Sequence, residues 1–342
     1  MSLSKKKKKV YLHGRDNINW SIDSDRKHLE NFLSKLDNIK ITSNLLSTNI
    51  VHSVWYNQLD DWKKILIKNK YVIAHITNNI EDNLESLNKI APYINLWIAA
   101  NQKQIEYLEQ NNFHYAYQPF YVDEKVFKNF NLSKEVLCQR LGIPYDIIKN
   151  KKIFLSIQRD SLGADLTKPK WQKNPDFLIE ILLNYKKHNP DFILLLAGPR
   201  RHYIISKLTE YNIPFFFYGK APDPNSDDIK ANNLDSHKIA LLYNLGDICI
   251  ITSKSESGPK AILESCWCKL PVISTNVGLA RDVISDEMLF SNAEEAIVLI
   301  NKLDDPDFRI SILDRNYSNM IDNFSYSRHL ERWTDIYAKF ED

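Results

Sequence analysis

The stretch that decides the fold is Ser253-Lys-Ser-Glu256-Ser-Gly-Pro259-Lys-Ala-Ile-Leu-Glu264, which is followed by the apolar run Pro271-Val-Ile-Ser-Thr. Another apolar run, Asp247–Ile251, precedes it. Short apolar runs flanked by turn residues are typical of buried strands, so this order predicts strand, loop, helix, strand. Gly258 lets the backbone approach a ligand closely, and Pro259 suits the first position of the helix.

The start of this predicted helix is a candidate anion site with two carboxylates beside it. Free backbone N–H groups at a helix start, here near Gly258, Lys260 and Ala261, favour a negatively charged ligand. Glu256 and Glu264 lie eight positions apart, one on the loop and one in the helix. Because carboxylates accept hydrogen bonds from hydroxyl groups, the pattern suits a ligand with both phosphates and hydroxyls, such as a nucleotide sugar.

The rest of the 342-residue chain alternates short β-rich runs with amphipathic ones, which predicts an α/β protein with parallel sheets and crossover helices. The expected strands are Val10–His13, Ile50–Val54, Tyr71–Ile76, Leu96–Ala100, Tyr115–Gln118, Lys152–Ile157, Phe192–Ala197, Pro214–Tyr218, Asp247–Ile251 and Pro271–Ser274. The expected helices are Asp25–Leu36, Asp176–Lys187, Arg201–Thr209, Ser236–Tyr243, the motif helix, Ala293–Leu303 and Arg328–Phe340. This length suits two doubly wound units, whose ligands bind beyond the C-terminal strand ends.

Composition excludes several classes of protein. A net charge of +2 argues against a general nucleic-acid binder. The sequence contains neither GxGxxG nor GxxxxGK[ST], which weakens the dinucleotide oxidoreductase and P-loop readings. Four cysteines at this length do not make a disulfide framework, so we expect reduced core thiols in a cytoplasmic protein.

The basic run Lys5–Lys9 precedes an apolar stretch that is too short for a signal peptide, and no apolar run is long enough to span a bilayer. These lysines suit either weak peripheral contact with anionic lipid at the inner face of the plasma membrane or a solvated tail. Asp60-Asp61 and Asp227-Asp228 lack the context of a metal site, and we expect no essential metal.

Four segments together resemble GT-B glycosyltransferases, and in particular the donor domain of the large retaining family 4 group. Glu256 to Glu264 is similar to that group's E-x7-E segment, and Pro271–Gly278 to the strand and turn after it. Arg159 with Lys173-Asn-Pro-Asp-Phe-Leu-Ile is similar to its basic pair, and Leu194-Leu-Leu-Ala-Gly198 to the strand that leads to the base pocket. The match covers residues 119–342 well, and residues 1–118 only by the order of strands.

The resemblance implies a GT-B architecture of two Rossmann-like domains that face each other across a cleft. Residues 1–122 would form the N-terminal acceptor-side domain, residues 123–324 the nucleotide-sugar donor domain, and residues 325–342 a C-terminal helix that returns to the first domain. The chain departs from the group's usual pattern at a few positions. Ser257 and Gln158 stand where glycines are usual, and 13 residues, Asp160–Gln172, separate the two basic residues.

The resemblance also implies roles for individual residues. Arg159 and Lys173 would hold the diphosphate, Glu256 the hydroxyls of the donor sugar, and Glu264 the ribose hydroxyls. The further donor-binding candidates are Gly14, Gly198, Gly258, Pro259, Lys260 and Ala261. Each of these residues has a plainer alternative as a surface or helix-face residue.

The first half contains weaker candidates. His75 is expected to end a strand, and the resemblance implies that a histidine in this region contacts the donor sugar; the alternative is an ordinary core or surface histidine. His13 and His52 also end strands, and the plainer reading is favoured for both. The candidates for lining an acceptor cleft, or for filling the core instead, are Arg15, Trp20, Trp55 and Tyr56.

The predicted function is that of a retaining glycosyltransferase, which transfers a hexose from a UDP- or GDP-sugar to a hydroxyl of a glycan or glycolipid, by analogy in surface polysaccharide or lipopolysaccharide biosynthesis. The nucleotide sugar would be a co-substrate, and the partners would be this donor and a glycan or lipid-linked acceptor, with no nucleic acid. Two alternatives stay open. One is a catalytically silent GT-B partner or regulatory subunit, and the other is an NDP-sugar epimerase or phosphorylase on the same fold.

Overall fold

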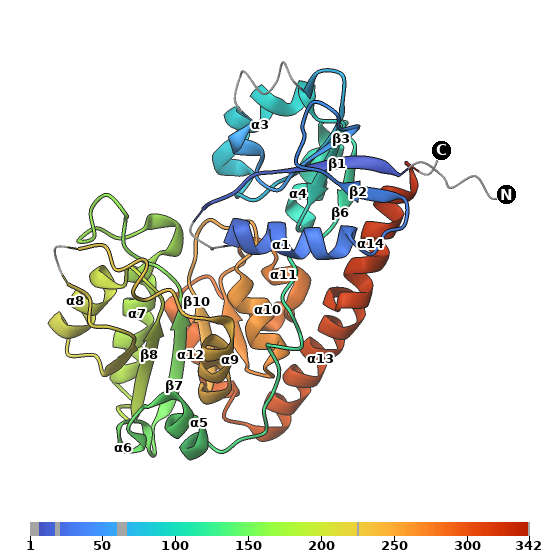
Figure 1. Cartoon of the computed structure of the whole chain (residues 1–342). Helices are drawn as coiled ribbons and strands as arrows, with labels where there is room; N and C mark the ends of the chain where they lie inside the picture. The colour runs from blue at the N-terminus through green and yellow to red at the C-terminus, as the bar shows by residue number, and fades with distance from the viewer. Residues whose placement is uncertain (1–6, 18–20, 60–66, 224–225, 341–342) are drawn as a thin grey trace. The chain divides into compact units, whose positions relative to one another are not determined.

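The computed structural model describes residues 7–17, 21–59, 67–223 and 226–340, and these residues form two compact units (Figure 1). Unit 1 consists of Met1–Tyr121 with Asn323–Asp342, and unit 2 of Val122–Asp322. Each unit is built on one parallel β-sheet, of six strands in unit 1 and five in unit 2. Lys5, Lys6, Trp20, Asp60 and Asp61 lie outside the described residues.

The sheet of unit 1 has the strand order β2-β1-β3-β4-β5-β6. The elements of this unit are β1 (Lys8–His13), α1 (Ser21–Leu33), β2 (Ile39–Ile41), β3 (Ile50–Ser53), η1 (Tyr56–Gln58), β4 (Tyr71–His75), η2 (Glu81–Asn83), α3 (Leu84–Ile90), η3 (Ala91–Tyr93), β5 (Leu96–Ala99), α4 (Gln102–Gln110), β6 (Tyr115–Tyr117) and α14 (Tyr326–Ala338). Apolar side chains from strands, helix α1 and helix α14 share one core, in which Val10, Leu33 and Tyr337 are fully covered.

Helix α14 is bound to this core by a chain of hydrogen bonds. The Tyr337 hydroxyl lies 2.7 Å from His52 Nδ1, and His52 Nε2 lies 2.7 Å from His75 Nε2. Trp333 contacts both imidazole rings, at 5.3 Å and 5.7 Å between centroids. The last helix of the chain is thus tied to β3 and β4 by polar groups within an apolar core.

The sheet of unit 2 has the strand order β11-β10-β7-β8-β9. The elements are α5 (Lys134–Leu141), α6 (Tyr145–Ile148), β7 (Lys152–Ile157), η4 (Trp171–Lys173), α7 (Pro175–Lys186), β8 (Phe192–Ala197), α8 (His202–Glu210), β9 (Phe215–Tyr218), α9 (Ser236–Leu245), β10 (Ile248–Ile251), α10 (Lys260–Trp267), β11 (Val272–Ser274), α11 (Ala280–Val283), η5 (Asp286–Met288), α12 (Ala293–Lys302) and α13 (Pro306–Phe324), whose last two residues belong to unit 1. Strand β8 is apolar and buried at every position, as a strand covered on both faces must be.

The order of the strands decides where each sheet can bind a ligand. In unit 2 the chain proceeds from β7 outward to β9, and then returns to add β10 and β11 on the other side of β7. The crossovers that follow β7 and β10 therefore diverge, which leaves a crevice beyond the carboxyl ends of these two strands. In unit 1 the corresponding position lies beyond β1 and β3. Residues just after these strands are the natural site candidates.

Most predicted elements are observed, with three corrections. Pro259 is the residue before helix α10, with φ −66° and ψ 103°, and not its first helical residue, because the helix begins at Lys260. Lys8 and Lys9 belong to strand β1, where they pair with Ile39 and Lys40, so a solvated tail cannot include them. The structure also contains elements that were not expected, namely strand β2 and helices α3, α4, α5, α6, α11 and the 19-residue α13.

The histidine pair predicts an acid-sensitive stability. Burial lowers the pKa of His52 well below its ordinary value and that of His75 to about 3. The folded protein thus keeps both rings neutral, whereas the unfolded chain binds protons below about pH 6.5. The free energy of unfolding should therefore fall as the pH drops below about 6.5, by roughly 1–2 kcal/mol for His75 alone between pH 6.5 and 5.

Urea-induced unfolding at pH 7 and pH 5 checks this prediction. His75→Gln should lose less stability on acidification than the wild type, while His114→Gln, which changes an exposed histidine, should behave as the wild type does. Other groups titrate alike in all three proteins, so the difference isolates His75. An equal loss for His75→Gln and the wild type would contradict the prediction.

Candidate functional site

The predicted cations and one predicted carboxylate come together at the carboxyl end of the unit 2 sheet. Arg159 follows β7, and Lys173 ends the short helix η4. Lys173 Nζ forms an ion pair with Glu256 Oε1, and the two side chains are only 17% and 18% exposed. The hydroxyl of Ser253, at the end of β10, donates to the same carboxylate oxygen over 3.2 Å. The pair is therefore oriented by both loops that flank the crevice.

Backbone hydrogen bonds fix these two loops to each other. The carbonyl of Gln172 accepts from the N–H groups of Lys254 (2.8 Å) and Ser255 (3.4 Å). The Thr252 hydroxyl contacts the carbonyls of Lys173 and Asn174, at 3.3 Å and 3.2 Å. The turn that carries Lys173 and the loop that carries Glu256 thus form one rigid piece of structure, although about 80 residues separate them in sequence.

Lys170 is a cation of this site that the sequence reasoning missed. Its side chain is half-buried, and burial together with the charges of Arg159 and Lys173 lowers its pKa to about 8. Glu256 raises that pKa and Arg200 lowers it further, so all four charged groups act on this one ammonium. The spacing of Lys168, Lys170 and Lys173 is the only sequence signal that could have pointed to it.

A fully buried ion pair underlies the loop after β7. Asp160 Oδ2 lies 2.9 Å from Arg201 Nε, and neither side chain is exposed. Burial raises the pKa of Asp160 to about 6, against the opposing effect of Arg201. Arg201 also donates to the Gln158 carbonyl (2.8 Å) and to Ser156 Oγ (3.0 Å). The Lys170 N–H donates to the Asp160 carbonyl over 2.7 Å. The buried pair therefore helps to fix the position of the backbone that carries Lys170.

Glu264 lies in helix α10, which begins after the loop that carries Glu256. The Tyr243 hydroxyl donates to its Oε2 over 2.8 Å, and this contact fixes the carboxylate. Burial raises the pKa of Glu264, while Tyr243 and Lys260 act in the opposite direction. Lys260 and Ala261 are the first two residues of the helix, where backbone N–H groups lack intrahelical partners.

Two glycines allow the loops of the site to approach each other. Gly278, with φ +51°, lies against the motif loop, where an added Cβ would come within 2.5 Å of the Ser257 carbonyl oxygen. Gly198, with φ +98°, ends β8, and a Cβ there would come within 2.8 Å of the Gln158 carbonyl oxygen. Gly198 was among the predicted donor-binding residues, whereas Gly278 was noted only as part of the turn after β11.

The first-half candidates lie in unit 1. His75 ends β4 as expected, but its ring contacts His52 and Trp333, which is the environment of a core histidine. Gly14 follows β1 with φ +93°, and a Cβ there would come within 3.0 Å of the Trp55 backbone nitrogen. His13 Nδ1 lies 2.9 Å from Ser53 Oγ, at the crevice position between β1 and β3.

The candidates for lining an acceptor cleft differ in how far they are exposed. Tyr56 is 1% exposed and its hydroxyl lies 3.3 Å from Ser86 Oγ, so it is a core residue. Trp55 is half-buried, and Arg15 is exposed with its backbone N–H donating to Gln58 Oε1 over 3.0 Å. Only these last two stay available for an acceptor.

The second predicted acidic pair has structural partners. Asp227 forms a 2.6 Å ion pair with Arg200, and Asp228 accepts from the Arg200 N–H and the Asn232 side-chain amide. Within the described ranges, no group of three or more His, Cys, Asp or Glu side chains gathers to hold a metal ion.

The four cysteines are unpaired and buried. No helix in the described part of the chain is both long and apolar enough to cross a membrane.

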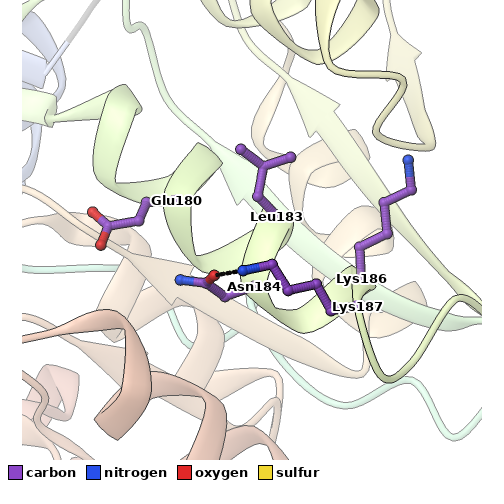
Figure 2. Close-up of a pocket in the computed structure, with 5 residues that line it drawn as sticks. All are labelled: Glu180, Leu183, Asn184, Lys186 and Lys187. Atoms are coloured by element: carbon purple, nitrogen blue, oxygen red, sulfur yellow. Dashed lines mark hydrogen bonds between the residues drawn. The ribbon is translucent and has the colours of Figure 1, made fainter.

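A shallow hollow of about 520 Å³ lies along helix α7, away from these residues (Figure 2). Its lining comes from one helix alone: Glu180, Leu183, Asn184, Lys186 and Lys187. Three of its four charged or amide side chains are engaged locally, since Lys187 Nζ donates to Asn184 Oδ1 over 2.8 Å and Lys186 Nζ donates to the Asn212 carbonyl over 2.6 Å. A hollow without polar groups that converge from several elements is a poor ligand site.

The fold is that of the GT-B glycosyltransferases, as solved structures show. One resembling structure is Anabaena HepE in complex with UDP and glucose, which is 13% identical with a TM-score of 0.70 over 97% of this chain and 100% of that chain. A glycosyltransferase from Rickettsia africae is 18% identical with a TM-score of 0.68 over 97% and 98% of the two chains. Sucrose-phosphate synthase from Thermosynechococcus elongatus is 16% identical with a TM-score of 0.65 over 93% and 78%.

Residues 147–305 match the family described as Glycosyl transferases group 1. The matched segment contains Arg159, Lys173 and both motif glutamates. No curated protein sequence matches the chain. The predicted resemblance to GT-B glycosyltransferases, the α/β fold class and the enzyme class, a glycosyltransferase, are confirmed by this match together with the fold.

The close approach at Gly278 predicts a local effect of substitution. Gly278→Ala should displace the motif loop, because the new Cβ would clash with a backbone oxygen that cannot rotate away. Binding of a nucleotide diphosphate should weaken by about tenfold or more, measured by calorimetry. Gly142→Ala is the control, since Gly142 also has positive φ (+68°) but nothing lies within 4 Å of its added Cβ. Equal affinities for the two variants would contradict the prediction.

The buried ion pair predicts a large effect on stability. Asp160→Ala leaves Arg201 charged, buried and unpaired, which should cost about 3–5 kcal/mol in the free energy of unfolding. Asp227→Ala removes a partly exposed ion pair of Arg200 and should cost about 1 kcal/mol or less. Urea-induced unfolding compares the two variants with the wild type, and similar losses for both would show that Asp160 is not the support described here.

Proposed function

We propose that the chain is a retaining glycosyltransferase that transfers a hexose from a UDP- or GDP-sugar to a hydroxyl of a glycan or glycolipid. The observation that supports this most strongly is the cationic cluster of Arg159 and Lys173, oriented by Glu256 at the sheet position where doubly wound folds bind ligands. HepE, whose structure holds UDP and glucose, shares the fold and supports a UDP-sugar as donor.

The charges of the site suit the departure of a nucleoside diphosphate. When the bond between the anomeric carbon and the diphosphate oxygen breaks, negative charge grows on that oxygen. Arg159 and Lys173 stabilise this charge because they are held in place before the reaction begins. The leaving oxygen then accepts the proton of the acceptor hydroxyl on the same face of the sugar, so the configuration is retained without an enzyme base.

The carboxylates have different tasks in this proposal. Glu256, which is paired with Lys173, accepts hydrogen bonds from donor-sugar hydroxyls, and Glu264, which is fixed by Tyr243, accepts them from the ribose. The backbone N–H groups of Lys260 and Ala261 contribute to binding of the anion. Gly198 and Gly258 with Pro259 shape the backbone around the nucleotide.

Unit 1 takes the acceptor in this proposal. Gly14, which follows β1 at the crevice position of its sheet, stays a donor-binding candidate, and Arg15 and Trp55 beside it are the candidates for lining the acceptor cleft. His75 is proposed to act on the donor sugar only if its link to His52 opens.

The enzyme works in the cytoplasm, where its four unpaired cysteines stay reduced, and supplies surface polysaccharide or lipopolysaccharide. The residues Lys5–Lys9 give weak contact with anionic lipid at the inner face of the membrane.

The test of this function is transfer from UDP- and GDP-hexoses to a panel of glycan and glycolipid acceptors. Lys173→Met should lower kcat at least about 100-fold and Arg159→Met similarly, because both remove charge where the transition state gains it. Lys168→Met, which changes a lysine that is 68% exposed, should leave kcat unchanged. NMR of the product should show the anomeric configuration of the donor.

Three outcomes would contradict the proposal. An inverted product would exclude retention. A double variant of Arg159 and Lys173 with near-normal turnover would exclude the diphosphate clamp. Donor binding without turnover over the whole panel would indicate a silent partner subunit, and sugar isomerisation without any acceptor would indicate an epimerase.

A further inference from the structure

The loop between the two predicted cations contains a structured hairpin. Ser161 and Pro169 form an antiparallel bridge, and the Leu162 N–H donates to the Lys168 carbonyl over 3.0 Å. The Lys170 N–H donates to the Asp160 carbonyl over 2.7 Å, and the side chain of the same Asp160 forms the buried ion pair with Arg201. Residue 170 is therefore fixed at the carboxyl end of β7, at the base of the hairpin and beside Arg159.

The two lysines at the end of the hairpin differ sharply in environment. Lys168 is 68% exposed and pairs loosely with Asp165 at 3.6 Å. Lys170 is half-buried, and its backbone links the two predicted cations: its N–H donates to the carbonyl of Asp160, the neighbour of Arg159, and its carbonyl accepts from the Lys173 N–H over 2.9 Å. The charges of Arg159, Lys173 and Arg200 all act on its ammonium group. The facing carboxylate is Glu256 from the loop after β10, and it is already paired with Lys173. Arg200 is compensated by Asp227 at 2.6 Å.

A half-buried lysine among like charges is costly for the empty protein. The main-chain hydrogen bonds of residue 170 form with any side chain at this position, so they do not account for a lysine here. The cost would be offset by an anion of more than one charge that draws the cations together. A diphosphate is such an anion, and it is the group that the proposed donor brings to this place.

We propose that Lys170 is a third diphosphate-binding cation, and that it takes up a proton from solvent when the nucleoside diphosphate binds. This inference rests on the proposed function and adds to it a residue and a proton-coupled step in binding. Lys170 is in part neutral in the empty site at mildly alkaline pH, and the bound phosphate oxygens restore its full charge. Donor affinity therefore falls as the pH rises past about 8, while Arg159 keeps its charge throughout.

The experiment is calorimetric titration of the whole protein with UDP and with GDP at pH 7.0 and pH 8.5. At pH 8.5 two buffers of different ionisation enthalpy report how many protons accompany binding. A lysine with a pKa of about 8 is roughly three-quarters neutral at pH 8.5, so the wild type should take up about 0.7 proton per nucleotide there and about 0.1 at pH 7.0.

Three variants separate binding from structure. Lys170→Gln should bind the nucleotide roughly tenfold more weakly at pH 7.0 and take up no proton at pH 8.5. Lys170→Arg keeps a charge that does not titrate, so it should bind within about threefold of the wild type with no proton uptake. Lys168→Gln is the matched control and should equal the wild type in both respects. Thermal unfolding of each variant confirms that it is folded.

The outcomes distinguish this inference from the proposed function. If Lys173→Gln weakens nucleotide binding but Lys170→Gln does not, the proposed diphosphate site is supported and the role of Lys170 as a third cation is contradicted. Proton uptake that persists in Lys170→Arg would assign the proton to another group and overturn the inference. If the wild type binds neither UDP nor GDP, the proposed donor fails, and the inference fails with it.

Discussion

The site depends on one ion pair, that between Lys173 and Glu256. It joins the turn before helix α7 to the loop after β10, and the Gln172 carbonyl reinforces this junction with two backbone hydrogen bonds. These loops leave their strands on opposite sides of the switch point, so they would otherwise diverge. The pair links the two sides of the crevice, and Glu256 is the one carboxylate among the charged groups that act on Lys170.

This arrangement supplies positive charge for the diphosphate of the proposed donor. Cations outnumber carboxylates around the crevice, and the buried Asp160–Arg201 pair keeps the loop after β7 from moving away under their mutual repulsion. Preorganised charges of this kind act most strongly where charge develops during the reaction. The expectation that no metal is needed rests on this positive charge, and it stays a prediction that activity in the presence of a chelator would examine.

The sequence predicts buried strands better than short strands and polar helices, for physical reasons. Strands such as Phe192–Ala197 are buried on both faces, so an uninterrupted apolar run reveals them with their correct bounds. The three-residue strand β2 is too short for such a signal, and α13 carries polar residues on most of its surface. The environment of Lys170 and the link from His52 to Tyr337 arise only in three dimensions, since the latter joins residues 285 positions apart. Local patterns do not encode such contacts.

The measurement that tests the central claim most directly is thermal stability against UDP, GDP and ADP and their common sugars, for the wild type and Glu264→Ala. A ligand at about 100 times its Kd stabilises a protein by roughly 2.7 kcal/mol, which is readily seen. The account predicts a shift with one nucleotide family in the wild type and its loss in Glu264→Ala, since the Tyr243-oriented carboxylate would hold the ribose. An equal shift in both proteins, or none with any nucleotide, would contradict the assignment of unit 2 as the donor domain.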